Sequence, residues 1–228
     1  MKLIIFDLDQ TLIDLIEVHD EAVLRMFKET FGVEARITEI DYAGRSLMDS
    51  FNVLAGMKGV PQNVIEAKKP HLMQTYERIF AEIVPEDASR HVLPGVRPLL
   101  EGLSRTGELL MLYTGDSPGI VRAVFKATGL GKYFKACFYG TEVKVRAEMV
   151  KKAIEKAQEM TGKQFESKDV VVIGDSVRDV ECGKAFGALT IALTTGIHTE
   201  AQLRERNPDF LFKDLGHYEE VMKAIGAV

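Results

Sequence analysis

Residues 2–11 read KLIIFDLDQT, a short apolar run that ends in two aspartates and a threonine. The apolar residues 2–6 have the composition of a strand that is buried on both faces of a sheet. In a regular strand the side chains of Asp7 and Asp9 would share one face and repel each other. A metal ion, a shared proton or a bend in the backbone would each relieve this repulsion, and the rest of the sequence bears on which of them operates.

Short apolar segments alternate with helical patterns from about residue 93 onward. The expected strands are residues 109–113, 136–139, 170–173, 190–193 and 210–212. Apolar residues spaced i, i+3, i+4 and i+7 predict helices that begin near residues 96, 118 and 150. This alternation predicts an α/β fold with a Rossmann-like, mostly parallel sheet that carries helices on both faces.

The stretch between the first strand and residue 93 breaks this alternation. A structureless connection of roughly 80 residues is not expected in a compact domain. Helical patterns occur instead around residues 23–31, 46–55 and 62–83. We therefore expect a discontinuous catalytic core, residues 1–14 and 93–228, and a small helical domain, residues 15–92, inserted after the first strand.

The composition is that of an ordinary globular protein, with 46% hydrophobic residues and a net charge of -5 over 228 residues. This acidic balance gives no reason to expect nucleic acid or an anionic membrane as a partner. No apolar run approaches the ~20 residues of a membrane span, and the N-terminus lacks a signal-peptide pattern, so we expect a cytoplasmic protein. Cys137 and Cys182 have no metal-ligand spacing, which predicts reduced thiols.

Carboxylates and hydroxyls follow three of the expected strands. Ligands of open parallel sheets bind at the carboxyl ends of the strands, which here carry residues 7–11, 114–117 and 174–179. Aspartates that converge there repel one another unless a hard cation compensates them. Mg²⁺ fits best, because it takes one or two carboxylates and typically lies beside a substrate phosphate.

The same edge offers groups that would bind a phosphoryl group. The hydroxyl of Thr114 and the backbone amides near Gly115 would donate to phosphate oxygens. A cationic side chain should complete the site. Lys144 is the first candidate because it follows the third expected strand of the core closely, and Arg146 and Lys151 are the alternatives.

These strand ends resemble the motifs of the haloacid dehalogenase superfamily. Residues 7–11 (DLDQT) are similar to its DxDxT motif, Thr114 to its second motif, Lys144 to its third, and residues 174–179 (GDSVRD) to its GDxxxD motif. The inserted helical domain lies where the family has its cap. Two departures are Gln10, where glycine is common, and Val145, where proline is common.

The resemblance implies a role for each of these residues. Asp7 would be the nucleophile that forms an aspartyl phosphate, and Asp9 the general acid and base. Thr114 and Lys144 would hold the phosphoryl oxygens. The implied Mg²⁺ ligands are the Asp7 and Asp175 carboxylates, the backbone carbonyl of Asp9, and Asp179 through water, unless Asp179 orients Lys144. The expected substrate-binding residues are Thr11, Gly115, Asp116, Arg45 and His19.

Asp9 and the cap indicate which reaction to expect. Haloacid dehalogenases lack the second aspartate, since a halide leaves without a proton, so Asp9 favours phosphate chemistry. The cap resembles those of phosphoglycolate phosphatases and β-phosphoglucomutases, which implies a small-molecule phosphate ester as substrate. Arg45 would bind a carboxylate or a second phosphate.

A phosphatase is the preferred hypothesis among the alternatives. A phosphomutase is the second, because His19 lies about where the mutases have a cap histidine. A receiver domain phosphorylated on aspartate would be about half this length, and a non-catalytic relative should have lost Asp7, Asp9 or Asp175, all of which are present.

Overall fold

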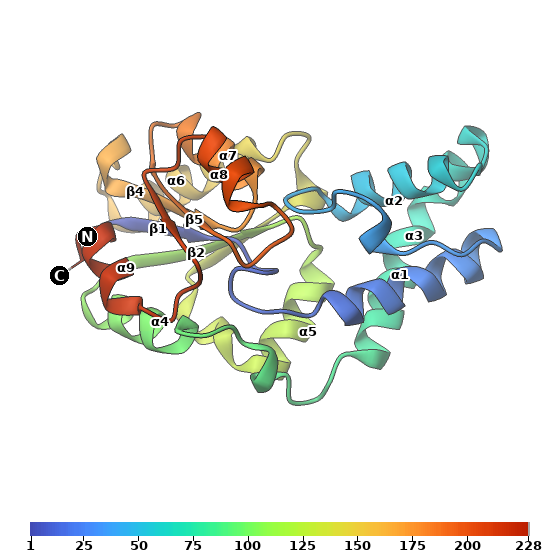
Figure 1. Cartoon of the computed structure of the whole chain (residues 1–228), viewed down its shortest axis with the longest axis horizontal. Helices are drawn as coiled ribbons and strands as arrows, with labels where there is room; N and C mark the ends of the chain where they lie inside the picture. Colours follow the sequence, from blue (N-terminus) through green and yellow to red (C-terminus); the bar gives the residue numbers. More distant parts are fainter. Residues whose placement is uncertain (228) are drawn as a thin grey trace.

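The computed structural model describes residues 1–227, and within them six parallel strands form one sheet in the order β3-β2-β1-β4-β5-β6 (Figure 1). The strands are β1 (Leu3–Phe6), β2 (Leu109–Thr114), β3 (Ala136–Tyr139), β4 (Val170–Gly174), β5 (Leu189–Leu193) and β6 (Phe210–Phe212). Phe6 is in register with Leu112 on one side and with Ile173 on the other. The carboxyl ends of β1, β2 and β4 therefore meet at one edge of the sheet, and the predicted fold class is confirmed.

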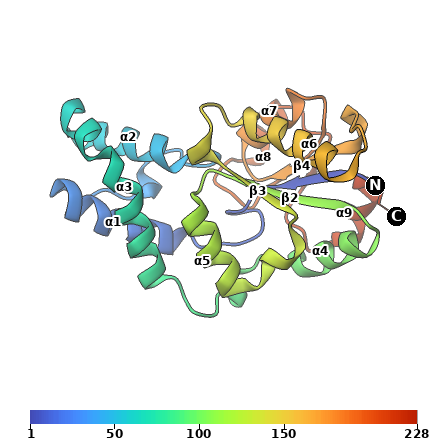
Figure 2. The ribbon, with the colours of Figure 1, turned by 180° about the vertical axis from the view of Figure 1, so that it is seen from behind.

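Helices cover both faces of this sheet (Figures 1 and 2). The core helices are α4 (Val96–Arg105), α5 (Pro118–Thr128), α6 (Ala147–Thr161), α7 (Val177–Lys184), α8 (Glu200–Glu205) and α9 (Tyr218–Ile225). Ile4 and Phe6 of β1 belong to the apolar cluster that includes α4, α5 and α9, whereas Leu3 and Ile5 belong to the cluster that includes α6. This alternation is why the strand is apolar at every position.

Helix α5 shows how local sequence fixes a boundary near the site. Ser117 has extended backbone, and its side chain accepts a hydrogen bond from the Ile120 amide, while Pro118 occupies the first turn. Both features are typical of a helix start. The helix ends at Gly129, whose φ of 70° is the left-handed conformation that glycine adopts without strain. The start of α5 therefore follows β2 after a turn of three residues, 115–117, which carries part of the site.

The inserted segment forms helices α1 (Ile16–Phe31), α2 (Leu47–Met57) and α3 (Gln62–Ile83), which lie beyond the carboxyl edge of the sheet (Figure 1). Buried aromatic rings hold α1 and α3 together, among them Phe27, Tyr76 and Phe80. Five short 3₁₀ helices complete the described chain: η1 (Ile37–Glu39), η2 (Ser89–His91), η3 (Leu130–Tyr133), η4 (Gly140–Glu142) and η5 (Ser167–Asp169).

The two chain segments that join this helical domain to the core lie side by side. Ile13 and Val92 form an antiparallel β-bridge. The Asp14 amide donates to the carbonyl of His91 at 2.9 Å, and the Leu93 amide donates to the carbonyl of Leu12 at 3.0 Å. The predicted domain limits, residues 14/15 and 92/93, lie at this pair of segments. None of the helices within residues 1–227 combines the length and the apolar character that a membrane crossing requires.

Candidate active site

A bend after β1 separates the two aspartates of the first motif. The Asp7 amide still donates to the Ile173 carbonyl of β4 at 2.9 Å, but the carbonyl of Leu8 already accepts from the Leu12 amide at 2.8 Å. Gln10 has a φ of 58°, the left-handed conformation that favours glycine. Strict strand alternation therefore ends at Asp7, and the two carboxylates reach different surroundings.

The Asp7 carboxylate lies in a cluster of buried acids with Asp175 and Asp179. One oxygen from each lies within 4.8 Å of the others. Arg146 compensates part of this charge: its Nη2 donates to Asp7 Oδ1 at 2.6 Å and to Asp179 Oδ1 at 2.8 Å. Its side chain is only 11% exposed, so the ion pairs are shielded from water.

Two further residues, Tyr113 and Ser176, fix the positions of these groups. The guanidinium of Arg146 lies over the ring of Tyr113, 4.5 Å from its centroid, and the hydroxyl of Tyr113 donates to Asp179 Oδ1 at 2.6 Å. Ser176 donates to the other Asp179 oxygen through its amide, at 2.9 Å, and through its hydroxyl. Both carboxylate oxygens of Asp179 therefore accept hydrogen bonds, whereas Asp7 is held mainly by Arg146.

The basic residue that the structure places at this cluster is Arg146, whereas Lys144, the first candidate, lines a neighbouring cavity with Arg45 and Gly115. Lys144 is exposed on the segment between η4 and α6, and Lys151 is exposed on α6. Arg146 directly precedes Ala147, the first residue of α6, and its side chain turns inward toward Asp7 and Asp179. The spacing of three basic residues along this segment could not show which one the backbone turns inward.

Burial and mutual repulsion shift the pKa values of the aspartates in this cluster. Burial raises the pKa of Asp7 to about 8, with help from Asp179 and Asp9 and against Arg146. Burial also raises the pKa of Asp175 well above its usual value, with help from Asp7 and Asp179. Burial opposes ionisation of Asp179 too, but Arg146 and hydrogen bonds from Tyr113 and Ser176 hold its pKa below the usual value. The cluster thus lacks positive charge for full ionisation, and its all-oxygen donor set fits Mg²⁺.

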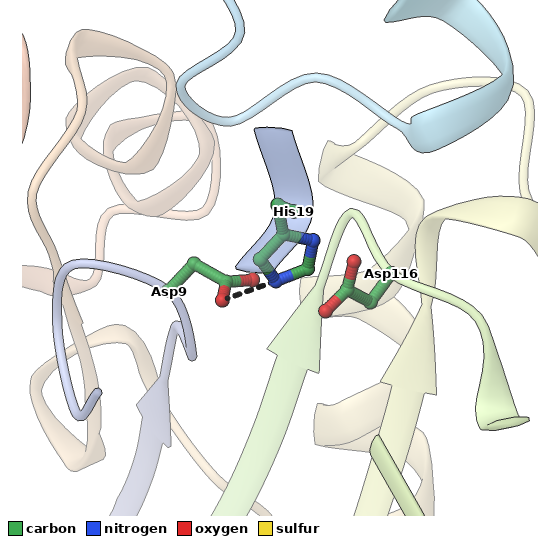
Figure 3. Close-up of side chains that lie close together, drawn as sticks. All are labelled: Asp9, His19 and Asp116. Atoms are coloured by element: carbon green, nitrogen blue, oxygen red, sulfur yellow. Dashed lines mark hydrogen bonds and ion pairs between the residues drawn. The ribbon is translucent and has the colours of Figure 1, made fainter. Parts of the chain in front are cut away.

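Asp9 belongs to a second cluster, with His19 of α1 and Asp116 from the turn after β2 (Figure 3). His19 Nε2 lies 3.2 Å from Asp9 Oδ1, and His19 Nδ1 lies 2.6 Å from the hydroxyl of Tyr76 on α3. Asp116 is 3% exposed, and its Oδ2 has no hydrogen-bond partner among the described residues. His19 therefore connects the helical domain to the acid of the core that the resemblance assigns to proton transfer.

The charged groups of this second cluster shift one another's pKa values. Burial disfavours the His19 cation, but Asp9 and Asp116 outweigh it and raise the pKa of His19 to about 9. Burial likewise opposes ionisation of Asp9, yet His19 holds the pKa of Asp9 below its usual value. Burial and the Asp9 charge raise the pKa of Asp116 well above its usual value. Asp9 and His19 therefore stabilise each other's charged forms, whereas burial and the Asp9 charge disfavour ionisation of Asp116.

A cleft between the core and the helical domain has a volume of about 70 Å³ and is lined by all three residues of the second cluster and by Asp7 and Asp175 of the first. Its lining from the core includes Asp7, Asp9, Thr114, Gly115, Asp116, Arg146 and Asp175, and from the helical domain Ile16, His19, Ile37, Tyr42, Ala43, Gly44, Arg45, Leu47 and Ser50. Thr114 is buried at the end of β2, where its Oγ1 accepts from the Asp116 amide at 3.2 Å. Most of the expected site residues therefore meet in one cleft.

Thr11 is the expected substrate-binding residue that lies elsewhere. It is completely buried, and its hydroxyl donates to Asp175 Oδ1 at 3.2 Å. The bend after Asp7 directs it into the structure, behind the acids. Thr11 therefore holds the Asp175 carboxylate in place through a hydrogen bond. The sequence spacing gave no signal of this role.

The helical domain contacts the core beside the cleft. Leu47 of α2 donates its amide to the Gly115 carbonyl at 3.0 Å, and a side chain at position 115 would collide with the carbonyl of Arg45. Arg178 of α7 pairs with Asp41 at 2.7 Å. Gly115 is therefore required for close approach of the two domains, which its place in the sequence did not reveal.

A further contact joins α3 to α5. Glu77 of α3 accepts hydrogen bonds from the Ser117 hydroxyl and from the Gly119 amide, the latter at 3.2 Å. Sequence reasoning missed Glu77, Asp41, Tyr76 and Tyr113. Only Tyr113 had a signal, because it directly precedes Thr114 in the strand that carries the second motif.

Comparisons with known proteins agree with this geometry. The sequence profile of the haloacid dehalogenase-like hydrolases matches residues 4–193. The chain is 26% identical to phosphoglycolate phosphatase of Synechococcus elongatus over 215 residues, which cover 93% of each chain. It is also 26% identical to the probable phosphatase IndB of Dickeya dadantii, over 99% of this chain and 94% of the relative.

Solved structures extend the likeness in fold. A β-phosphoglucomutase from Clostridium difficile superimposes with a TM-score of 0.81 over 99% of this chain and 97% of that one, at 14% identity. The match of the profile spans most of the chain, and the strand ends carry the motifs that the resemblance rested on. The chain therefore belongs to the haloacid dehalogenase-like hydrolase family.

Proposed function

We propose that this enzyme is a Mg²⁺-dependent phosphatase that hydrolyses a small phosphorylated metabolite through an aspartyl phosphate on Asp7. One observation carries the proposal: the two aspartates of the first motif lie in one cleft but in different electrostatic surroundings. Asp7 lies against Arg146, while Asp9 lies against His19. Two carboxylates with separate environments can divide nucleophilic attack and proton transfer between them.

The acids at the edge of the sheet would hold the metal. The carboxylates of Asp7 and Asp175 and the backbone carbonyl of Asp9 are the proposed ligands, with Asp179 as a ligand through water. The bound ion would supply positive charge that keeps Asp7 ionised and stabilises the phosphoryl oxygens. Support comes from burial and mutual repulsion, which raise the pKa values of Asp7 and Asp175, so that a cation between them would favour their ionised forms.

The chain's own residues would carry the reaction in two steps. Asp7 attacks phosphorus, and the bond from phosphorus to the leaving oxygen breaks while Asp9 passes to that oxygen the proton that it shares with His19. Asp9 then accepts a proton from the water that attacks the aspartyl phosphate, which releases inorganic phosphate. Thr114 and the nearby backbone amides, together with Arg146, hold the phosphoryl oxygens. Arg146 takes the place first assigned to Lys144.

The cleft supports a small substrate. Its volume of about 70 Å³ is well below the ~300–1,000 Å³ of pockets for drug-sized ligands. Arg45 lines the cleft from the helical domain, and a guanidinium suits a carboxylate. Since several relatives are named phosphoglycolate phosphatase, 2-phosphoglycolate is the first substrate we propose.

The test is phosphate release from p-nitrophenyl phosphate and from a panel that includes 2-phosphoglycolate and hexose phosphates. We expect release that requires Mg²⁺ and that is absent in Asp7→Asn purified in parallel, which controls for contaminating phosphatases. An absence of release above background from every substrate, with and without Mg²⁺, contradicts the proposal.

A phosphomutase is the second candidate, and the contact of His19 with Asp9 favours it. A histidine from the cap could couple proton transfer to closure over a sugar phosphate. Incubation with β-glucose 1-phosphate and a trace of the bisphosphate separates the two functions. A mutase yields glucose 6-phosphate, whereas a phosphatase yields free phosphate.

A further inference from the structure

The cluster of Asp9, His19 and Asp116 has the features of a cation site of its own. One potential ligand atom from each residue lies within 4.8 Å of the other two. The three side chains come from the loop after β1, from α1 and from the turn after β2, and Figure 3 shows them directed toward one another. None of these three side chains belongs to the Asp7, Asp175 and Asp179 cluster proposed for Mg²⁺, to which Asp9 would contribute only its backbone carbonyl.

Asp116 gives an independent reason to expect a ligand here. The residue is 3% exposed and lines the cleft, yet its Oδ2 has no hydrogen-bond partner among the described residues. A buried polar atom without a partner is destabilising, and more so when the group is charged. Something that is positively charged, or that donates a hydrogen bond, would remove this cost.

The spacing suits a small dication. Zn²⁺ binds nitrogen and oxygen ligands at about 2.0–2.2 Å in a tetrahedral arrangement, which places neighbouring ligand atoms about 3.3–3.6 Å apart. His19 Nε2 and Asp9 Oδ1 are already 3.2 Å apart. A ligand atom of Asp116 lies within 4.8 Å of one from each of these two residues, so that Asp116 would complete a set of three ligands. The fourth position would face the cleft.

Tyr76 provides the outer contact that such a site needs. Histidines that bind metals through one ring nitrogen usually make a hydrogen bond with the other, which fixes the tautomer and the ring orientation. His19 Nδ1 lies 2.6 Å from the hydroxyl of Tyr76, a completely buried residue of α3. A metal at Nε2 would take the place of the proton there, and Nδ1 would keep its proton and donate it to the Tyr76 hydroxyl.

The donor set also selects the metal. Mg²⁺ prefers an octahedral shell of oxygen ligands, whereas an imidazole with two carboxylates suits Zn²⁺ and similar transition metals, which also bind more tightly in general. We propose that Asp9, His19 and Asp116 form a second metal site, which binds Zn²⁺ or a similar transition-metal dication and inhibits the enzyme while it is occupied.

Inhibition follows from the identity of the ligands. A metal on Asp9 Oδ1 occupies the oxygen that would carry a proton to the leaving group, and because His19 belongs to the helical domain, the same ion ties that domain to the core. This consequence rests on the proposed phosphatase reaction. Binding of the metal does not, so the two can be tested separately.

Binding is tested by calorimetric titration of Zn²⁺ into the full-length protein in a buffer saturated with Mg²⁺. We expect one bound Zn²⁺ per chain in the wild type. His19→Gln and Asp116→Asn should each weaken binding at least tenfold, and Tyr76→Phe by about 10–100-fold. The matched control is His71→Gln, an exposed histidine of α3, which should bind Zn²⁺ like the wild type. Asp175→Asn should also keep the Zn²⁺ site.

Several results would overturn the site: no Zn²⁺ binding by the wild type, unchanged binding by His19→Gln and Asp116→Asn, or loss of binding in Asp175→Asn. Melting curves without metal establish whether each variant is folded. If His19→Gln or Asp116→Asn does not fold, the Zn²⁺ affinities of the wild type, His71→Gln and Tyr76→Phe test the site instead. In the activity arm, Zn²⁺ should inhibit turnover of p-nitrophenyl phosphate with a midpoint at the measured Kd. Full activity at full occupancy overturns the inhibitory role.

Discussion

Replacement of Arg146 is the most informative perturbation of the phosphoryl site. Its Nη2 lies 2.6 Å from Asp7 and 2.8 Å from Asp179, and the side chain is 11% exposed. Loss of one partner from a buried ion pair typically costs about 3–5 kcal/mol, and loss of one donor to a developing oxyanion lowers kcat by about 10²–10³-fold. We therefore expect Arg146→Ala to lower kcat/KM at least 100-fold. Arg146→Lys should retain part of the activity, because it keeps the charge but loses the planar fork.

The assay is Mg²⁺-dependent release of p-nitrophenol, together with inhibition by inorganic phosphate as a measure of binding without turnover. Lys144→Ala is the matched control, since Lys144 is exposed two residues away on the same segment, and we expect it to stay within about twofold of the wild type, as surface charges contribute little. If Lys144→Ala loses activity at least 100-fold while Arg146→Ala keeps it, the assignment of Arg146 is refuted.

Three further predictions concern the surroundings of the site. Tyr113→Leu removes the ring beneath Arg146 and the hydrogen bond to Asp179, so kcat/KM should fall about tenfold. The loss should be smaller in an Arg146→Ala background, where only the hydrogen bond remains to be lost, and equal losses in both backgrounds contradict this. Gly119→Ala places a methyl group against the Glu77 carboxylate and should raise KM by weakening the contact of α3 with α5. An unchanged KM in steady-state kinetics would contradict this prediction. Burial raises the pKa of Asp7 to about 8. Without metal, the contribution of Asp7 to the free energy of unfolding is therefore full below the usual carboxyl pKa and is lost as pH rises through about 8. The rise in Tm caused by Mg²⁺ should be larger at about pH 8.5 than at about pH 6, and an equal rise at both would argue against a metal at Asp7.

The sheet and most of the site could be predicted because their sequence signals are local. A strand buried on both faces must be apolar along its length, and the residues that follow β1, β2 and β4 reach the same edge through parallel pairing alone. Asp7, Asp9, Thr114, Asp116 and Asp175 were found in this way, and all of them line the cleft.

Residues whose roles depend on a particular backbone turn or on the docking of the helical domain could not be predicted. Lys144 and Arg146 are two residues apart, and only the start of α6 decides which of them faces Asp7. The bend at Gln10 directs Thr11 toward Asp175, away from the cleft. Tyr76 and Glu77 are adjacent on α3. The contact of Tyr76 with His19 depends on how α3 packs against α1, and the contact of Glu77 with α5 exists only because the helical domain is seated on the core.

The central claim is that Asp7 accepts the phosphoryl group, and peptide mass spectrometry after a rapid acid quench tests it most directly. Enzyme mixed with Mg²⁺ and p-nitrophenyl phosphate should carry one phosphoryl group on the peptide that contains Asp7. The modification should be absent in Asp7→Asn and in samples without Mg²⁺. Steady release of phosphate with no phosphoryl group on that peptide, together with retained activity in Asp7→Asn, would contradict the mechanism.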